Sequence, residues 1–226
     1  MKKLFLIPWM LLAILVSITA CSEDEPLADG QEQTVPGGNE EGGSDEGNDE
    51  NEPGGNEDGA DGRYLVVYCS RTGNTERMAQ TIWSTLNCDM IAVEPETPYD
   101  EDYNAMLDRA QAELDAIGQG NYPAITTSVE SLEDYDIVFV GYPIWFGHMA
   151  TPMQTFLHSH ASLLSGKRIA LFASSGSSGI STSERDAASL VPDAVFEESL
   201  LLTSGTLSNM GTRIPAWLEQ LGITHD

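Results

Sequence analysis

Residues 64–75 read Tyr64-Leu65-Val66-Val67-Tyr68-Cys69-Ser70-Arg71-Thr72-Gly73-Asn74-Thr75, and this stretch decides the fold. Its first half is a short, nearly all-apolar run whose length and β-branched content suit a buried strand. Its second half turns through small hydroxyl residues into a predicted helix. The apolar residues of that helix fall on one face, at Met78, Ala79, Ile82, Trp83 and Leu86.

The same alternation of apolar runs and helical periods continues to the end of the chain. Such alternation implies right-handed βαβ units and a parallel sheet covered on both faces. We therefore expect an α/β fold, doubly wound, with five parallel strands in three layers. The further strands are expected at 90–93, 137–141, 168–173 and 194–202, where Glu197 and Glu198 suggest an edge. The further helices are expected at 103–117, from Pro152, at 181–190, and within 207–221 with Pro215 in the first turn.

Ligands of such sheets bind beyond the carboxyl ends of the strands, so three loops are the candidates. The first, 70–75, supplies hydroxyl groups and Gly73 at the start of a helix, which is the chemistry of a phosphate cradle. The alternative is ordinary N-capping by a Ser/Thr-rich turn. The loop lacks the Gly-Lys-Ser/Thr ending of a nucleotide triphosphate loop and is not a Gly-x-Gly-x-x-Gly turn.

The second loop reads Gly141-Tyr142-Pro143-Ile144-Trp145-Phe146-Gly147-His148. Large aromatic side chains after a parallel strand would form an exposed apolar patch unless something planar covers them. A flavin ring stacked on Trp145 would do so. The alternative is packing against a neighbouring loop, which we favour for Tyr142 and leave open for Phe146. The third loop, Ser174-Ser175-Gly176-Ser177-Ser178-Gly179, lets the backbone approach a ligand closely.

Together these loops resemble those of the flavodoxin family, and the resemblance covers residues 63–226. Ser70, Thr72, Gly73 and Thr75 match the family's phosphate loop, and Gly-Tyr-Pro-Ile-Trp resembles one subgroup. The resemblance implies strand order 2-1-3-4-5 and an FMN-binding domain. Arg71 either pairs with the phosphate or points to solvent, and we favour solvent. The implied cofactor-binding residues are Ser70, Arg71, Thr72, Gly73, Asn74, Thr75, Pro143, Ile144, Trp145, Phe146, Gly147, Ser174, Ser175 and Gly176.

The beginning of the chain is typical of an exported lipoprotein. Two lysines and an apolar run lead to Ile18-Thr19-Ala20-Cys21, which resembles a bacterial lipobox. The resemblance implies a signal peptide at 1–20 and lipid on Cys21; an uncleaved membrane helix is the alternative, at the short limit of length. The acidic residues after Cys21 resemble the surface-export signal of Bacteroidetes lipoproteins. Residues 21–62 form an acidic, Gly-rich segment without aromatic residues, which we expect to be disordered.

Charge and the remaining titratable residues exclude several function classes. The chain carries a formal charge of -26, and residues 63–226 hold eight Lys and Arg against twenty-one Asp and Glu. Such acidity argues against nucleic-acid binding, and it is compatible either with docking a basic protein partner or simply with solubility. Cys69 and Cys88 are interpreted as small hydrophobes, and a disulfide between them stays open. His158 and His160 cannot share one side of a helix, so no metal site is expected.

The function that these features favour is electron transfer by bound FMN, on a protein held by lipid at the outer membrane or the cell surface. A redox protein would be its partner, and no residue is expected to act as a catalytic acid or base. The alternatives are an FMN-dependent reductase of NAD(P)H or quinones, and a surface-displayed binding module without redox activity. Contact with a membrane is expected through the lipid alone.

Overall fold

The computed structural model describes residues 63–223 of the chain. The predicted signal peptide, the predicted lipidation site Cys21 and the acidic segment lie outside the described residues. The strands are β1 (Tyr64–Tyr68), β2 (Asp89–Ala92), β3 (Ile137–Trp145), β4 (His148–Met149), β5 (Arg168–Ser175), β6 (Val195–Phe196) and β7 (Leu200–Thr203). The helices are α1 (Asn74–Leu86), α2 (Tyr103–Ile117), α3 (Thr151–Ser159), α4 (Ala161–Leu164), α5 (Ser181–Leu190), the short 3-10 helix η1 (Leu207–Asn209) and α6 (Met210–Gln220).

The sheet has the strand order β2-β1-β3-β5-β6, with β7 also paired to β5. All of these pairs are parallel, and only the two-residue β4 runs antiparallel to β3. Counted as continuous strands this is the predicted order 2-1-3-4-5, which confirms the predicted topology. The fifth predicted strand is divided into β6 and β7, and residues 197–199 between them belong to neither strand. Glu197 and Glu198, which had suggested an edge, lie in this break.

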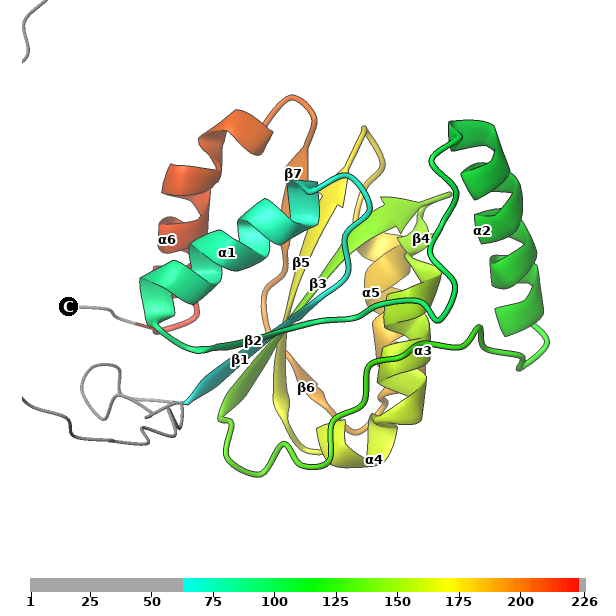
Figure 1. Cartoon of the computed structure of the whole chain (residues 1–226). Coiled ribbons are helices and arrows are strands. Elements are labelled where there is room, and N and C mark those ends of the chain that lie inside the picture. Colours follow the sequence, from blue (N-terminus) through cyan, green and yellow to red (C-terminus); the bar gives the residue numbers. More distant parts are fainter. Residues whose placement is uncertain (1–62, 224–226) are drawn as a thin grey trace, which may run out of the picture. The chain divides into compact units, whose positions relative to one another are not determined.

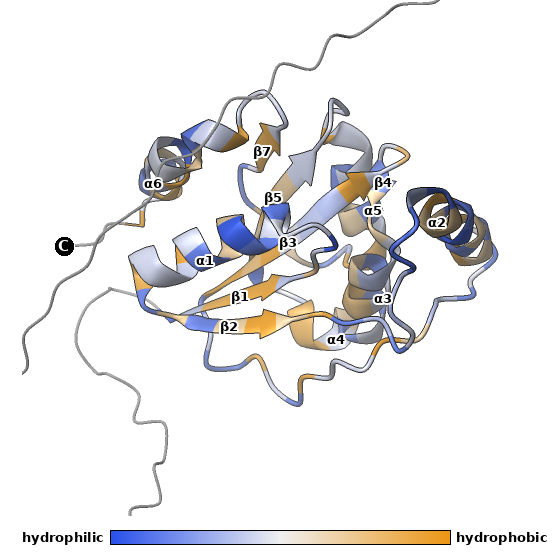
Figure 2. Ribbon diagram, turned by 45° about the horizontal axis from the view of Figure 1, so that its top comes forward, coloured by the Kyte–Doolittle hydropathy of each residue, from blue (hydrophilic) through white to orange (hydrophobic). Residues whose placement is uncertain are grey.

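Helices cover both faces of the sheet and give the three predicted layers (Figure 1). Side chains alternate along each strand, so Val66 and Phe139 pack with α1 and α6, whereas Val67 and Val140 pack with α3 and α5. Both faces of a central strand are thus buried, which explains why its sequence is continuously apolar rather than alternating. Figure 2 shows this apolar character along β1.

Gly141 is required by the packing of β3 against β5. A Cβ atom at this position would lie 2.1 Å from the ring of Phe172, closer than any real contact. Because Gly141 has no side chain, the ring of its strand partner Phe172 occupies the space beside it and packs in the apolar cluster under α1 and α6. This glycine therefore fixes the core next to the carboxyl ends of the strands, where a ligand is expected.

Two details of the predicted helices are wrong, and a third helix lies at the periphery. Trp83 is 45% exposed, because the buried face of α1 runs through Thr75, Met78 and Ile82 instead. The peripheral helix is α2, which lies outside α3 and buries only Met106 and Ala110 (Figure 1). Pro215 stands inside α6 rather than in its first turn, since the preceding turn of 3-10 helix shifts the start of α6 to Met210.

Two kinds of feature are absent from residues 63–223. No helix there is long and apolar enough to cross a membrane. Nor does that part of the chain bring three or more His, Cys, Asp or Glu side chains together in a group that could hold a metal ion.

Candidate functional site

A cavity of about 180 Å³ opens at the carboxyl ends of β1 and β3. The first loop borders it with Ser70 and Arg71, and the end of β3 borders it with Pro143 and Trp145. The segment after β2 closes a further side and contributes Tyr99. The structure thus brings together the first two of the three predicted loops around one hollow.

The first loop leads from this cavity into an open helix N-terminus. Gly73 adopts a left-handed conformation with φ 79° and precedes α1, and no side chain caps the helix. The first backbone bond of the helix runs from the N–H of Arg77 to the carbonyl of Gly73. The earlier N–H groups are therefore left to an anion, which the helix dipole also favours. N-capping, the alternative explanation of this sequence, is not what the structure shows.

The hydroxyl groups of this loop have different surroundings. Thr75 is buried, and its Oγ1 lies 2.8 Å from Oγ of Ser174 at the end of β5. Thr72 is exposed, and its Oγ1 accepts only a long contact of 3.5 Å from Asn74. Thr72 is therefore free to meet a ligand, whereas Thr75 already joins the first loop to the third.

The Arg71 side chain does not simply point to solvent. Its Nη2 donates to the carbonyl oxygens of Asp100 and Glu101, at 3.0 and 3.1 Å. The favoured prediction for Arg71 was solvent, and it is wrong because these carbonyls of the segment after β2 lie within reach. Arg71 thus ties that segment to the first loop.

The predicted second loop is largely a strand. β3 continues to Trp145 and turns through Phe146 and Gly147, with φ 52° and 86°, into β4. Two consecutive left-handed residues make the kind of tight turn that joins antiparallel strands. Tyr142 is fully buried and donates to Oγ of Ser183 at 3.1 Å, so its predicted packing role is confirmed. Phe146 is 49% exposed, so packing against a neighbouring loop does not account for it.

Trp145 borders the cavity from the end of β3. Its ring meets the edge of the Tyr99 ring at 5.0 Å between centroids. The hydroxyl of Tyr99 bonds to the carboxylate of Glu113 and lies 2.8 Å from Oγ1 of Thr151. Burial, and then the bond to Glu113, raise the pKa of Tyr99 above its ordinary value. Arg109 lies 4.1 Å over the Tyr99 ring and bonds Glu113 at 2.7 Å.

Sequence reasoning missed Tyr99 and its partners. The signal was available, because 93–99 directly follows β2 and β2 is the neighbour of β1 in the sheet. The rule that ligands bind at the carboxyl ends of the strands applies to β2 as well.

The predicted third loop begins later than expected. β5 includes Ser174 and Ser175, because β7 pairs with it as far as Thr203, and Gly176 is the first loop residue. Ser175 is buried, and its Oγ has no hydrogen-bond partner within the described part of the chain. A buried hydroxyl without a partner costs about 1–3 kcal/mol, so it points to a ligand group that is not part of the protein.

The residues present fit FMN. An open helix N-terminus suits the phosphate, a tryptophan beside an open cavity suits the ring, and an unpaired serine hydroxyl suits a polar edge. Cys69 borders the cavity and Cys88 does not, and neither thiol is reactive: burial raises the pKa of each to about 12, and both are free.

Comparison with known proteins agrees with this geometry. A family model described as flavodoxin matches residues 63–221. The chain belongs to the flavodoxin family. The family expected from the sequence is thereby confirmed, and the expectation of FMN as cofactor is supported.

Solved structures resemble this flavodoxin domain over its whole length. A protein from Bacteroides eggerthii, provisionally described as a flavoprotein, is 30% identical, with TM-score 0.61, covering 73% of this chain and 100% of the other. A second one, from Bacteroides uniformis, is 26% identical, with TM-score 0.58, covering 70% and 98%. A flavoprotein from Lactobacillus acidophilus, solved in complex with FMN, shares the fold at 24% identity and TM-score 0.54, covering 67% and 99%.

Proposed function

We propose that this flavodoxin-like protein transfers electrons through non-covalently bound FMN while fastened to a membrane by lipid on Cys21. The observation that carries the proposal is the uncapped N-terminus of α1. It ends the family's phosphate-loop sequence, whose first residues Ser70 and Arg71 border a cavity together with Trp145. Export and lipid attachment are supported by the residues up to Cys21 alone.

The chain's own residues would hold the cofactor by three kinds of contact. The first N–H groups of α1 and the hydroxyls of Ser70 and Thr72 would bind the phosphate. Trp145 would stack on the ring system and keep water from one side of it. The hydroxyl of Ser175 and the backbone at Gly176 would bond its polar edge. FMN, when bound, supplies the redox chemistry, and the protein orients it and sets its potential.

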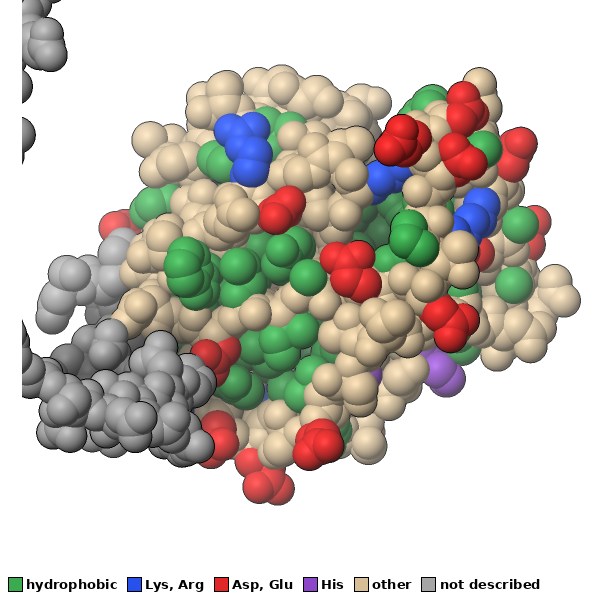
Figure 3. All heavy atoms as spheres, in the orientation of Figure 1, with side chains coloured by type: hydrophobic (Ala, Val, Ile, Leu, Met, Phe, Trp, Pro, Cys, Tyr) green, Lys and Arg blue, Asp and Glu red, His purple; other side chains and the backbone are tan. Residues whose placement is uncertain are grey.

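The charge around the cavity favours a cationic partner. Glu94 borders the cavity, and Asp100 and Glu101 lie in the segment that Arg71 ties down. Figure 3 shows acidic side chains spread over this face and few basic ones. An acidic rim accelerates encounter with a basic redox protein and disfavours additional negative charge on a bound cofactor.

A titration of the purified protein with FMN, followed by absorbance and tryptophan emission, tests the proposal. We expect saturable binding with quenched emission, and weaker binding of riboflavin, which lacks the phosphate. Absence of saturation at 100-fold excess of FMN over protein would contradict electron transfer and leave the binding-module alternative. With FMN bound, rapid steady-state oxidation of NAD(P)H by quinones would identify a reductase instead of a carrier.

A further inference from the structure

A second cavity, of about 360 Å³, lies on the other side of the β3–β4 turn. It is bordered by the second half of α2, by Phe146 and His148 of the turn, by Gln154 of α3 and by Asp186 of α5. Its volume is within the range of small-molecule sites. No residue of this cavity borders the candidate FMN cavity.

The apolar side of this cavity is formed by α2 and by the turn between β3 and β4. Leu114 and Ile117 of α2 are only half buried and border the cavity. Phe146 faces them from the turn, 49% exposed and at a φ of 52°. A bulky residue in the left-handed region is strained, and such strain persists where the surrounding structure imposes it and gathers at ligand sites.

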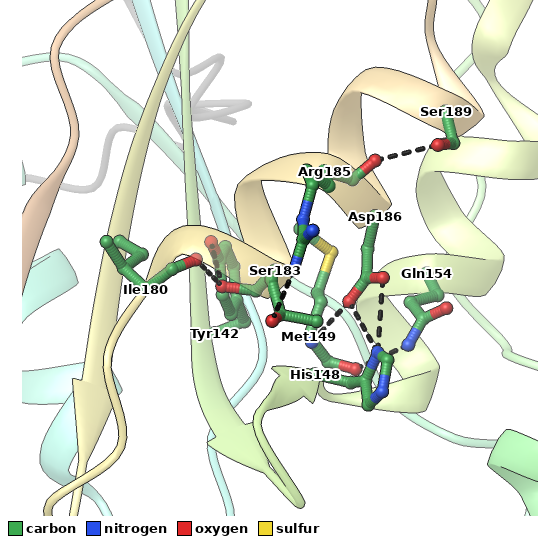
Figure 4. Close-up of polar contacts among 10 residues, drawn as sticks. Tyr142, His148, Met149, Gln154, Ile180, Ser183, Arg185, Asp186 and Ser189 are labelled. Atoms are coloured by element: carbon green, nitrogen blue, oxygen red, sulfur yellow. Dashed lines mark hydrogen bonds and ion pairs between the residues drawn. The ribbon is translucent and has the colours of Figure 1, made fainter.

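His148 presents one fixed nitrogen to this cavity. Its Nδ1 lies 3.1 and 3.2 Å from the two carboxylate oxygens of Asp186, which also accepts from the N–H of Met149 at 3.1 Å (Figure 4). A carboxylate only accepts, so Nδ1 carries the proton and Nε2 of the neutral ring is an acceptor. No described residue bonds Nε2, and the side chain is 45% exposed.

Gln154 supplies a second acceptor without a partner. It is only 4% exposed, and its Nε2 donates to the carbonyl of Met149 at 2.6 Å. That bond fixes the orientation of the amide, so the other end is the oxygen Oε1. Among residues 63–223 no group donates to Oε1, and this oxygen does not belong to the fully buried atoms without a partner, so it is open to the cavity. An amide oxygen that is open to a cavity can accept a hydrogen bond from a ligand.

The charge of the cavity excludes one class of ligand. Asp115 and Asp186 border it, and neither lysine nor arginine does. Anions are therefore repelled. A ligand that suits these groups has a flat apolar body for Phe146, Leu114 and Ile117, and hydroxyl groups that donate to the two acceptors.

We propose that this cavity is a binding site for a small, neutral, hydroxylated aromatic molecule, held by hydrogen bonds to Nε2 of His148 and Oε1 of Gln154. Asp186 is a positioning residue, because it fixes the tautomer of His148. The proposal goes beyond the FMN function and does not depend on it.

Titration of the full-length protein with resorcinol, followed by calorimetry and by NMR signals of the histidine rings, tests the site. We expect saturable binding with a dissociation constant of about 1 mM or below, as small ligands with few atoms allow. The His148 signals should shift and those of His158, which stacks on Tyr122 at the surface, should not. Two matched probes define the chemistry: 1,3-dimethoxybenzene has the same ring without donors, and benzoate is an anion. Both should bind at least tenfold more weakly.

Three variants locate the site. His148→Ala should weaken resorcinol binding at least tenfold, and the surface control His158→Ala should leave it unchanged. Leu114→Trp should fill the cavity from a half-buried position of α2 and abolish binding without lowering the melting temperature. This second variant keeps the test valid if His148→Ala fails to fold. The proposal is overturned if resorcinol does not saturate at 10 mM, if dimethoxybenzene binds equally well, if benzylammonium binds more tightly, or if both cavity variants bind normally. Saturation with FMN should not change any of these results, so failure of the FMN proposal remains a separate outcome.

Discussion

The hydroxyl groups of Thr75 and Ser174 lie 2.8 Å apart in a buried contact between residues 99 positions apart in the sequence. Thr75 belongs to the first turn of α1, and Ser174 stands near the carboxyl end of β5. The next residue, Ser175, carries the buried hydroxyl that has no partner among the described residues. This contact therefore holds the candidate phosphate loop in register with the candidate contact to the polar edge of FMN.

Thr75→Val should destabilise the domain, because it keeps the volume of the side chain and leaves the Ser174 hydroxyl buried without its partner. The expected loss is about 1–3 kcal/mol of unfolding free energy, measured by urea melts. Adding Ser174→Ala should recover part of the loss, as a double-mutant cycle for two residues in contact requires. Equal stability of Thr75→Val and the unaltered protein would show that the contact contributes nothing.

Thr72→Ala should weaken FMN binding and leave the stability of the domain unchanged. Its hydroxyl is exposed and has only a 3.5 Å contact with Asn74, so urea melts should be unchanged. Loss of a hydrogen bond to a charged phosphate should weaken FMN binding by about 1.5–3 kcal/mol. Riboflavin, which has no phosphate, serves as the internal control. An equal loss for both flavins would contradict a phosphate contact at Thr72.

Trp145→Ala should impair both binding and stability. Loss of stacking should weaken FMN binding by about 1–3 kcal/mol, by analogy with bases on aromatic side chains. Because the rings of Trp145 and Tyr99 also pack in a T-shaped pair, we expect a loss of unfolding free energy of about 0.5–1.5 kcal/mol, which is typical of aromatic pairs. Trp83→Ala, which removes an exposed tryptophan of α1, is the matched control. Unaltered FMN affinity of Trp145→Ala would remove the stacking proposal.

The buried thiol of Cys69 should make stability fall at alkaline pH. Burial raises its folded pKa from 9.0 to about 12, so the thiol stays neutral in the folded state while it ionises in the unfolded chain. Its contribution is complete below the unfolded pKa and is lost as pH rises from there toward the folded pKa. Urea melts at pH 8 and pH 10.5 should therefore differ less for Cys69→Ala than for the unaltered protein. An identical pH dependence of both would mean that Cys69 ionises in the folded protein.

Cys21→Ser should abolish lipid attachment and leave an unprocessed precursor, because the proposed anchor is a thioether on this sulfur. Metabolic labelling with a radioactive fatty acid, together with the mobility of the protein on a gel, measures both effects. Cys88→Ser should retain label and processing and serves as the control. A Cys21→Ser variant that is processed and found in the membrane fraction like the unaltered protein would disprove the lipobox.

The fold was predictable because the signals that define it are local. Buried parallel strands are apolar without interruption, as in β1 and β5, and the helix expected at 181–190 has those bounds in the structure. The turn between β3 and β4 was not predictable. It depends on Phe146 adopting a left-handed conformation, and a phenylalanine gives no sign of that in a sequence, unlike the Asn-Gly or Asp-Gly pairs that usually mark such turns.

The loops of the candidate site were predicted from the sequence, but the residues that pack behind them were missed. Short motifs identified the loops, because phosphate binding needs particular residues at fixed spacing. Tyr99, Arg109 and Glu113 follow no such spacing. Their bonds arise only when the segment after β2 folds back against α2, and Arg71 changes its predicted role for the same reason.

The chain enters and leaves the described domain on one side. Tyr64 begins β1 at the amino end of the sheet, and Leu221 and Ile223 after α6 pack in the same apolar cluster as Tyr64 (Figure 1). The FMN cavity opens at the opposite, carboxyl end of the strands. Immobilisation on an electrode, or fusion to a reporter protein, through either of these ends would therefore leave the cofactor edge facing solution, where its redox current can be recorded.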